Sequence, residues 1–476
     1  MEPQAAGAVA GGGPEALVGS SWDLRRSAAL RRLRHRFAAV EPRIEAFLPE
    51  PGRWRRLAAA IAETPGGRRA GAAARLDGTA MGVKDVFHVD GFATRAGSRL
   101  PPQALAGGEG RAVQRLRRAG SLLLGKTVTT ELAYFEPGPT RNPHDPQRTP
   151  GGSSSGSAAA VAAGLCPFAL GTQTIGSVCR PAAFCGVVGF KPSYDRIPRD
   201  GLVPLAPSLD HVGVLAADVG WAARAAAVLC DGWRGSRPGG HGGPPLHPVE
   251  DTAVEAGSAV VGAGLRAGPP AGSAAPRPVL AVPVGPYLDP LEPAGAAGFA
   301  AACASLSRAG YPLLRVPVMP DFAEVAARHR LLLAAEAAAV HRRLYDSWRH
   351  LLRPRTVELL ERGLAAAPAE VEAAREGRLR LRRELEEAMA REGFDLWLSA
   401  AAPGPAPRGL AVTGDPICNL PWTQAGLPTV ALPAGRSPEG MPLGVQLTAR
   451  FGGDEALLGW AAAAAAALRR GDAGAA

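Results

Sequence analysis

The chain of 476 residues contains very little lysine: Lys84, Lys126 and Lys191 are the only three, although lysine and arginine together number 53. The excess of arginine is spread over the whole chain, which indicates a compositional preference rather than one basic patch. Each remaining lysine is therefore a candidate for a position that arginine cannot serve. A catalytic base is such a position, because a desolvated lysine can lose its proton and arginine cannot.

Features of membrane, secreted and zinc-binding proteins are also missing. No apolar run reaches the roughly 18 residues that a membrane helix requires, and the amino-terminal residues lack the basic region of a signal peptide. The six cysteines are scattered without a C-x-x-C pair, which is typical of reduced thiols. We therefore expect a cytoplasmic protein with no metal site and no membrane partner.

The arginine-rich segments give a net charge of +10 without a nucleic-acid-binding motif. In residues 25–36 and 375–392, arginine alternates with apolar residues as on the solvated face of a helix, where the arginine stem packs on apolar neighbours. No aromatic stacking platform accompanies these segments. We expect no nucleic-acid partner.

Predicted strands and helices alternate along the chain, which indicates the α/β class with a mixed sheet covered by helices. Expected strands lie within 76–91, 121–127, 167–174, 394–400, 428–435 and 442–450, and expected helices within 22–64, 110–120, 157–164, 324–392 and at the carboxyl terminus. We expect a single domain over 21–470, with a Gly/Pro-rich loop insertion at 232–280, a disordered segment at 1–20 and a tail at 471–476.

Two short motifs match known sites but lack the required context. Residues 120–127, "GSLLLGKT", fit the phosphate-binding P-loop, yet a helix precedes them and three leucines occupy the loop. Residues 152–156, "GSSSG", fit the nucleophile elbow, yet a Pro-rich irregular stretch precedes them instead of a strand. We therefore predict neither a nucleotide site nor a serine hydrolase with a catalytic histidine.

Two loops rich in Gly and Ser lie next to buried structure. "TPGGSSSGSAAAVAAG" (149–164) continues into an apolar helix, unlike a flexible linker. The second segment, "GTQTIGSVCRPAAFCGVVGFKPS" (171–193), begins where the predicted strand 167–174 leads into a loop. These loops and Lys84, at the end of another strand, suggest a Ser-Ser-Lys set. A neutral buried lysine can activate a serine, and backbone N–H groups of a Gly-rich turn can stabilise an oxyanion.

With these features, the sequence resembles the amidase signature family. The resemblance extends from about residue 22 to 470 and includes both loops, "GVKDVF" (82–87), "GKTVTTELAY" (125–134), "SLDHVG" (208–213) and "NLPWTQAGLPTVALPAG" (419–435). The combination is much more specific than any five-letter motif. The resemblance implies that Ser177 is the acyl-enzyme nucleophile, Ser153 the bridging serine after a cis peptide bond, and Lys84 the general base.

The resemblance also implies roles around the triad. The backbone N–H groups of Thr174, Ile175, Gly176 and Ser177 would form the oxyanion hole, and Ser154 would support the network. No metal, organic cofactor or histidine is needed. Lys126 and Lys191 are expected to be structural.

Departures from the family pattern bear on the substrate. Ile175 replaces a glycine beside the nucleophile in several members. Arg180 occupies the position at which malonamidase-like members carry an arginine that binds the substrate carboxylate. A structural ion-pair role for Arg180 is equally open. The A subunits of tRNA-dependent amidotransferases instead carry "SIRQP" and an N-L-A-R-Y-D-G stretch, where this chain has "SVCRP" and "EAAAVHRRLYDS" (336–347). Fatty-acid amide hydrolases add a hydrophobic membrane-binding segment, which this chain lacks.

The sequence thus predicts an amidase that converts a small carboxamide into acid and ammonia through an acyl-serine intermediate. The alternatives are the A subunit of a tRNA-dependent amidotransferase, a biuret or carboxybiuret hydrolase on the same fold, and a catalytically silent scaffold. The last conflicts with the intact Lys84, Ser153 and Ser177. Many relatives are dimers, so a homodimer is an open option.

Overall fold

A computed structural model describes residues 23–25, 27–63, 76–234 and 277–473. In this part of the chain, strands join into one ten-stranded sheet in the order β2-β1-β3-β5-β4-β9-β10-β8-β6-β7. The strands are β1 (Ala80–Lys84), β2 (Leu122–Thr127), β3 (Phe168–Gln173), β4 (Val188–Lys191), β5 (His211–Ala216), β6 (Leu280–Val284), β7 (Leu313–Pro317), β8 (Leu396–Ala400), β9 (Thr429–Arg436) and β10 (Pro442–Thr448).

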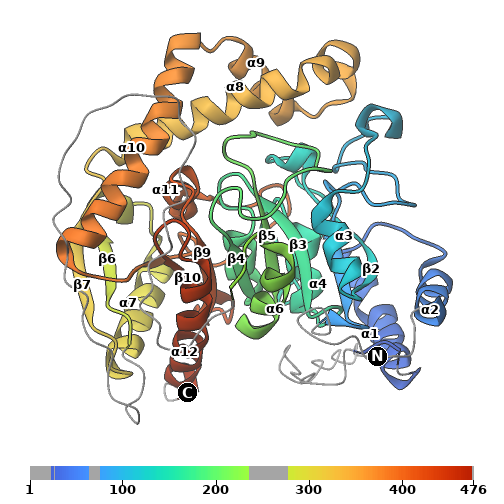
Figure 1. Cartoon of the computed structure of the whole chain (residues 1–476), viewed down its shortest axis with the longest axis horizontal. Coiled ribbons are helices and arrows are strands. Elements are labelled where there is room, and N and C mark those ends of the chain that lie inside the picture. Colours follow the sequence, from blue (N-terminus) through green and yellow to red (C-terminus); the bar gives the residue numbers. More distant parts are fainter. Residues whose placement is uncertain (1–22, 26, 64–75, 235–276, 474–476) are drawn as a thin grey trace, which may run out of the picture.

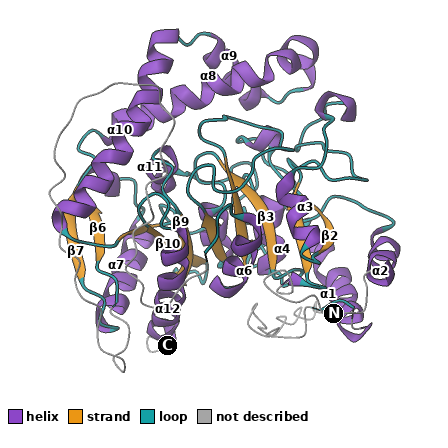
Figure 2. Cartoon of the chain, viewed as in Figure 1, coloured by secondary structure: helices purple, strands orange, loops and turns teal. Residues whose placement is uncertain are grey.

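The sheet is mixed, as the sequence predicts. β1 pairs in parallel with β2 and β3, and β6 pairs in parallel with β7 and β8. The strands between these two groups pair antiparallel. Figure 2 shows the strands running through the molecule between helices.

Helices lie on both faces of the sheet. They are α1 (Ser27–Ile44), α2 (Arg53–Glu63), α3 (Arg111–Arg118), α4 (Ser155–Ala162), α5 (Cys179–Cys185), α6 (Val219–Leu229), α7 (Pro293–Arg308), α8 (Phe322–Trp348), α9 (Pro354–Leu364), α10 (Pro368–Glu392), α11 (Leu420–Gln424) and α12 (Asp454–Ala473). Helices α8, α9 and α10 lie together at the top of Figure 1.

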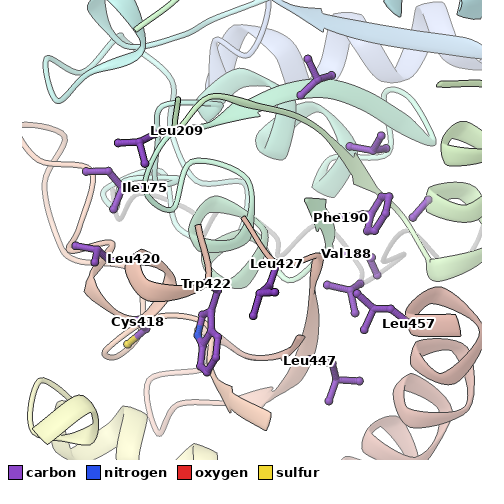
Figure 3. Packing of buried hydrophobic residues seen from close by; sticks show 14 of the residues in the cluster. Ile175, Val188, Phe190, Leu209, Cys418, Leu420, Trp422, Leu427, Leu447 and Leu457 are labelled. Atoms are coloured by element: carbon purple, nitrogen blue, oxygen red, sulfur yellow. The ribbon is translucent and has the colours of Figure 1, made fainter. Parts of the chain in front are cut away.

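Two hydrophobic clusters occupy the two faces, because successive side chains of a strand point to opposite sides. In β3, Phe168 and Leu170 belong to the cluster shared with α3, α6 and α12, whereas Ala169 belongs to the cluster shared with α1, α4 and α5. Figure 3 shows part of the first cluster, with Trp422 and Leu427 among its members. The α/β/α arrangement predicted from the sequence is therefore confirmed.

Some predicted boundaries differ from the structure. No strand is predicted from the sequence at β4, β5, β6 or β7; β4 and β5 contain glycine, which weakens a strand signal. Helix α12 continues to Ala473, into the predicted tail. The predicted disordered segment 1–20 lies outside the described residues, and the predicted insertion 232–280 is described only at its two ends.

The small residues of the 149–164 loop allow close packing. A Cβ atom on Gly156 would lie 2.1 Å from the carbonyl oxygen of Ala46 and 2.4 Å from the backbone nitrogen of Val128. Gly151 has a φ of 85°, a conformation that other residues rarely adopt. Glycine at these two positions therefore lets the start of α4 lie against the backbone of neighbouring segments.

We expect Gly156→Ala to lower the free energy of unfolding by about 1–3 kcal/mol, because the new methyl group collides with backbone. Helix propensity alone predicts the opposite sign, since alanine is favoured over glycine by up to about 1 kcal/mol inside a helix. Urea unfolding measures the difference. Gly108→Ala, whose Cβ would meet nothing within 4 Å, is the matched control and should change stability little. A stabilised Gly156→Ala protein would contradict the packing argument.

Candidate active site

Lys84 is the last residue of β1, and its side chain is completely buried. Its Nζ donates hydrogen bonds to Ser153 Oγ and to Thr172 Oγ1, both at 2.7 Å. Thr172 lies on β3, the parallel neighbour of β1, and Ser153 lies in the loop before α4. The carboxyl ends of parallel strands meet at one edge of a sheet, which brings these three side chains together.

Burial lowers the pKa of Lys84 to about 7, and the negative charge of Asp210 partly opposes this shift. A substantial fraction of the amine is therefore neutral near neutral pH, where it can accept a proton. Asp210 is itself buried: it accepts hydrogen bonds from the Thr174 hydroxyl and from the backbone N–H groups of Leu205 and Ala206.

The other two lysines are also buried, but neither donates a hydrogen bond to a serine of the described residues. Burial lowers the pKa of Lys191 to about 7 as well, yet its Nζ donates to the carbonyl oxygens of Leu427 and Pro192. Lys126 Nζ lies 2.8 Å from Asp85 Oδ1 in a buried ion pair and donates to the carbonyl of Phe87 at 2.6 Å. A lowered pKa is thus common to these lysines, and the contact with Ser153 distinguishes Lys84.

The loop that carries Ser153 is fixed by its neighbours. The peptide bond between Gly152 and Ser153 is cis. The Ser153 carbonyl accepts from the N–H of Thr130 at 3.3 Å. Ser154 Oγ accepts from the N–H of Thr172 and donates to the carbonyl of the same residue, both at 3.3 Å. Ser154 therefore ties the loop to β3.

The loop 174–177 follows β3 and is held by its carbonyl groups. The Thr174 carbonyl accepts from Nε2 of His329, the Ile175 carbonyl accepts from the Thr423 hydroxyl, and the Gly176 carbonyl accepts from the N–H of Arg180. Because C=O and N–H of one trans peptide point in opposite directions, the next N–H groups face away from these partners.

The same loop therefore presents free backbone donors. Among the described residues, the N–H groups of Ile175, Gly176 and Ser177 have no hydrogen-bond acceptor. Ser177, Ile175 and Thr174 line a small cavity, and Ser177 is 8% exposed. Free N–H donors beside a hydroxyl at a cavity are the arrangement that stabilises a developing oxyanion.

Arg180 also lines this cavity, but its guanidinium is largely engaged by the protein. It is buried, and its Nη2 donates to the carbonyl of Gly152 at 2.6 Å and to the Thr413 hydroxyl at 3.2 Å. Its Nη1 donates to the carbonyl of Gly414. Its buried Nε has no partner in the described part of the chain. Arg180 thus holds the peptide that precedes Ser153.

Sequence reasoning missed Thr172, His329 and Thr423. Thr172 stands in the segment 171–193, and its place near the end of the predicted strand 167–174 was the available signal. His329 lies 155 positions from Thr174 and Thr423 lies 248 positions from Ile175, so no local pattern connects them. Burial lowers the pKa of His329 to about 3, which keeps its ring neutral.

Comparison with known proteins identifies the family. The model of the Amidase family matches residues 28–458. The chain belongs to the amidase signature family. It is an enzyme of the class that hydrolyses amides.

Individual relatives of this amidase have different names. It is 31% identical to the A subunit of the glutamyl-tRNA(Gln) amidotransferase of Synechococcus sp. (strain RCC307), over 89% of this chain and 90% of that protein. A solved amidase matches with a TM-score of 0.74 and 32% identity, over 92% of this chain and 95% of that chain. The native peptide amidase from Stenotrophomonas maltophilia matches with a TM-score of 0.69 and 26% identity, over 94% of each chain.

Family membership does not select among these subtypes. The Synechococcus protein is named as the amidotransferase type that the sequence around Arg180 disfavours, whereas the two solved structures are called amidases. In the described part of the chain, no helix combines the length and the apolar character needed to cross a membrane.

We expect Lys126→Ala to destabilise the amidase by about 3–5 kcal/mol, because it leaves the buried Asp85 carboxylate without its counter-ion. Burial raises the pKa of Asp85. The loss should therefore shrink as the pH falls, since a protonated Asp85 needs no counter-ion. Urea unfolding at several pH values tests this, with the exposed Arg343→Ala on α8 as the control. A loss equal to that of the control would refute the proposed role of the ion pair.

Proposed function

We propose that this chain is a free-standing amidase that hydrolyses a carboxamide to a carboxylic acid and ammonia through an acyl-Ser177 intermediate. The observation that carries the proposal is the 2.7 Å contact between the buried Lys84 Nζ and Ser153 Oγ. A buried lysine with a pKa of about 7 is poised to act as a base at neutral pH.

The proposed reaction begins with proton transfer. A neutral amine carries one lone pair, so the contact between Lys84 and Ser153 can reverse its direction, with the serine hydroxyl donating. Ser153 then takes the proton of Ser177, whose oxygen attacks the amide carbon. The oxyanion that forms is bound by backbone N–H groups of residues 174–177.

The remaining steps return the proton. Lys84 gives it back through Ser153 to the departing nitrogen, which leaves as ammonia. Water then attacks the acyl-Ser177 ester along the same proton path and releases the acid. Each step uses groups of the protein and water, so the proposed chemistry calls for no metal or organic cofactor.

The predicted binding of a substrate carboxylate by Arg180 stays a prediction. Its two terminal nitrogens already donate to protein oxygens, which leaves Nε as the donor without a partner in the described residues. The predicted homodimer likewise stays a prediction.

A second candidate function is the one that the Synechococcus relative is named for, the A subunit of a tRNA-dependent amidotransferase. The observation in its favour is the 31% identity to that protein over 89% of this chain. In that case glutamine would be the amide, and the ammonia would pass to a partner protein. The two functions share the chemistry at Ser177 and differ in substrate and in partners.

We expect the purified chain alone to release ammonia from at least one amide in a panel of malonamate, propionamide, benzamide, indoleacetamide, biuret and glutamine. Ser177→Ala should abolish that release, because it removes the nucleophile. A coupled glutamate dehydrogenase assay measures ammonia. Preference for malonamate would support carboxylate binding at Arg180. If no amide in the panel releases ammonia, and partner proteins co-purify with the chain from its native host, the amidotransferase function is favoured instead.

We expect kcat/KM of the wild-type enzyme to rise with pH through an inflection near the Lys84 pKa of about 7, because the base must be neutral. Lys84→Ala should lower kcat by at least about a hundredfold and remove the inflection. The pH profile of ammonia release measures both. Lys126→Ala should keep the inflection, since Lys126 donates no hydrogen bond to a serine of the described residues. Near-normal turnover by a folded Lys84→Ala protein would disprove the role of Lys84.

A further inference from the structure

A larger cavity lies next to the small one that Ser177 lines. Its volume is about 590 Å³, within the range of small-molecule sites. Tyr134, Phe135, Ile175 and Leu333 line both cavities, so the two are adjacent. A molecule whose amide lies at Ser177 would therefore extend its acyl group into the larger cavity, hereafter the outer cavity.

The wall of the outer cavity is largely apolar. Leu333 on α8 and Leu359 on α9 contribute to it, together with Val412, Ile417 and Leu420 from the segment before and at the start of α11. Figure 3 shows Ile175 and Leu420 close to each other at the edge of the core. Burying apolar acyl surface against such a wall removes it from water and so favours binding.

Charged groups on the same wall are predominantly positive. Arg330, Arg355 and Arg362 line the outer cavity, along with Glu358 and Asp415. Glu358 Oε1 lies 4.0 Å from Nε of Arg362, so these two charges largely offset each other. The third arginine, Arg355, directs its Nη1 to neutral carbonyl oxygens.

The negative charge of Asp415 also has neighbours within the protein that offset it. Burial lowers the pKa of Arg180 to about 9, and the negative charge of Asp415 opposes this shift. Asp415 Oδ1 additionally accepts from the N–H of Ile417 at 2.9 Å. The acidic residues of the wall thus have cationic or N–H neighbours, and positive charge remains.

Arg330 is the arginine of this wall with the most freedom to bind a ligand. It is exposed, and no ion pair or hydrogen bond of its guanidinium is found among the described residues. It lines the outer cavity and not the small one with Ser177. Its neighbour His329 anchors this turn of α8 to the Thr174 carbonyl, and Leu333 lies one turn further along the same helix face.

We propose that the substrate is an amide whose acyl chain follows the apolar wall and ends in a carboxylate bound by Arg330. This inference rests on the proposed amidase function. Arg355 adds positive charge to the same wall, and a guanidinium binds a carboxylate through two parallel hydrogen bonds. Recognition at Arg330 places the carboxylate in the outer cavity, whereas malonamate bound at Arg180 would have its carboxylate in the small cavity with Ser177.

The test compares two amides that differ at the far end of the chain. Adipamate carries a carboxylate there, and hexanamide carries a methyl group. We expect wild-type kcat/KM to be about tenfold higher for adipamate, mainly through KM, with a preference that decreases as salt is added. Arg330→Gln should remove most of that preference and leave hexanamide turnover within about twofold of wild type, as for loss of one ion-pair contact. Arg342→Gln, on the same helix and paired with Asp346, should retain it.

A binding measurement separates this inference from the proposed function. Calorimetry on Ser177→Ala should show tighter binding of adipamate than of hexanamide, and the double variant with Arg330→Gln should lose the difference. If this binding pattern holds but wild type hydrolyses neither of these amides nor any amide of the panel above, the proposed function fails and the carboxylate site stands. Equal turnover of both amides, equal binding of both, or a preference that survives Arg330→Gln would each overturn the inference.

Discussion

The candidate active site depends on the complete desolvation of one lysine, Lys84, that has no carboxylate in contact with it. Lys84 is followed in sequence by Asp85, yet the two side chains have different partners: Asp85 pairs with Lys126, and Lys84 contacts two hydroxyl groups. A carboxylate in contact with Lys84 would favour its charged form and raise its pKa. Hydroxyl partners leave desolvation as the main effect, and the pKa of Lys84 falls to about 7. Because Asp85 is paired with Lys126, its carboxylate does not favour the charged form of Lys84, and the neutral amine that the proposed mechanism needs stays accessible.

A second constraint acts on the loop of the proposed nucleophile. Each carbonyl from Thr174 to Gly176 has a donor, and these donors come from α8, α11 and α5. Gln173 adds to this network: its Oε1 accepts from the N–H groups of Val178 and Cys179, and its Nε2 donates to Thr423. Hydrogen bonds in a buried network of this kind strengthen one another and fix peptide orientation. Preorganised donors need no rearrangement when charge develops during the reaction.

The chemistry and the substrate pocket are built from different parts of the chain. The triad proposed here comes from β1, the loop before α4 and the loop after β3, which carry the family's signature residues. The outer cavity comes mainly from α8, α9 and the segment 412–420. Relatives that share the first set can therefore differ in the second, which is consistent with the different names of the Synechococcus amidotransferase protein and the peptide amidase.

The sequence by itself determined the class of fold, the family and the candidate triad. Short local patterns carry this information: an apolar strand that ends at Lys84, two loops rich in Gly and Ser, and the motifs around them. The tertiary structure decided how Arg180 is used, because its partners Gly152, Thr413 and Gly414 lie on both sides of it in the sequence. It also places Thr172 beside Lys84, His329 against the Thr174 carbonyl and Arg330 at the outer cavity, since contacts between distant segments depend on how the helices pack on the sheet. Local patterns report which residues are present, and only the fold brings their charges and hydrogen-bonding groups within reach of each other.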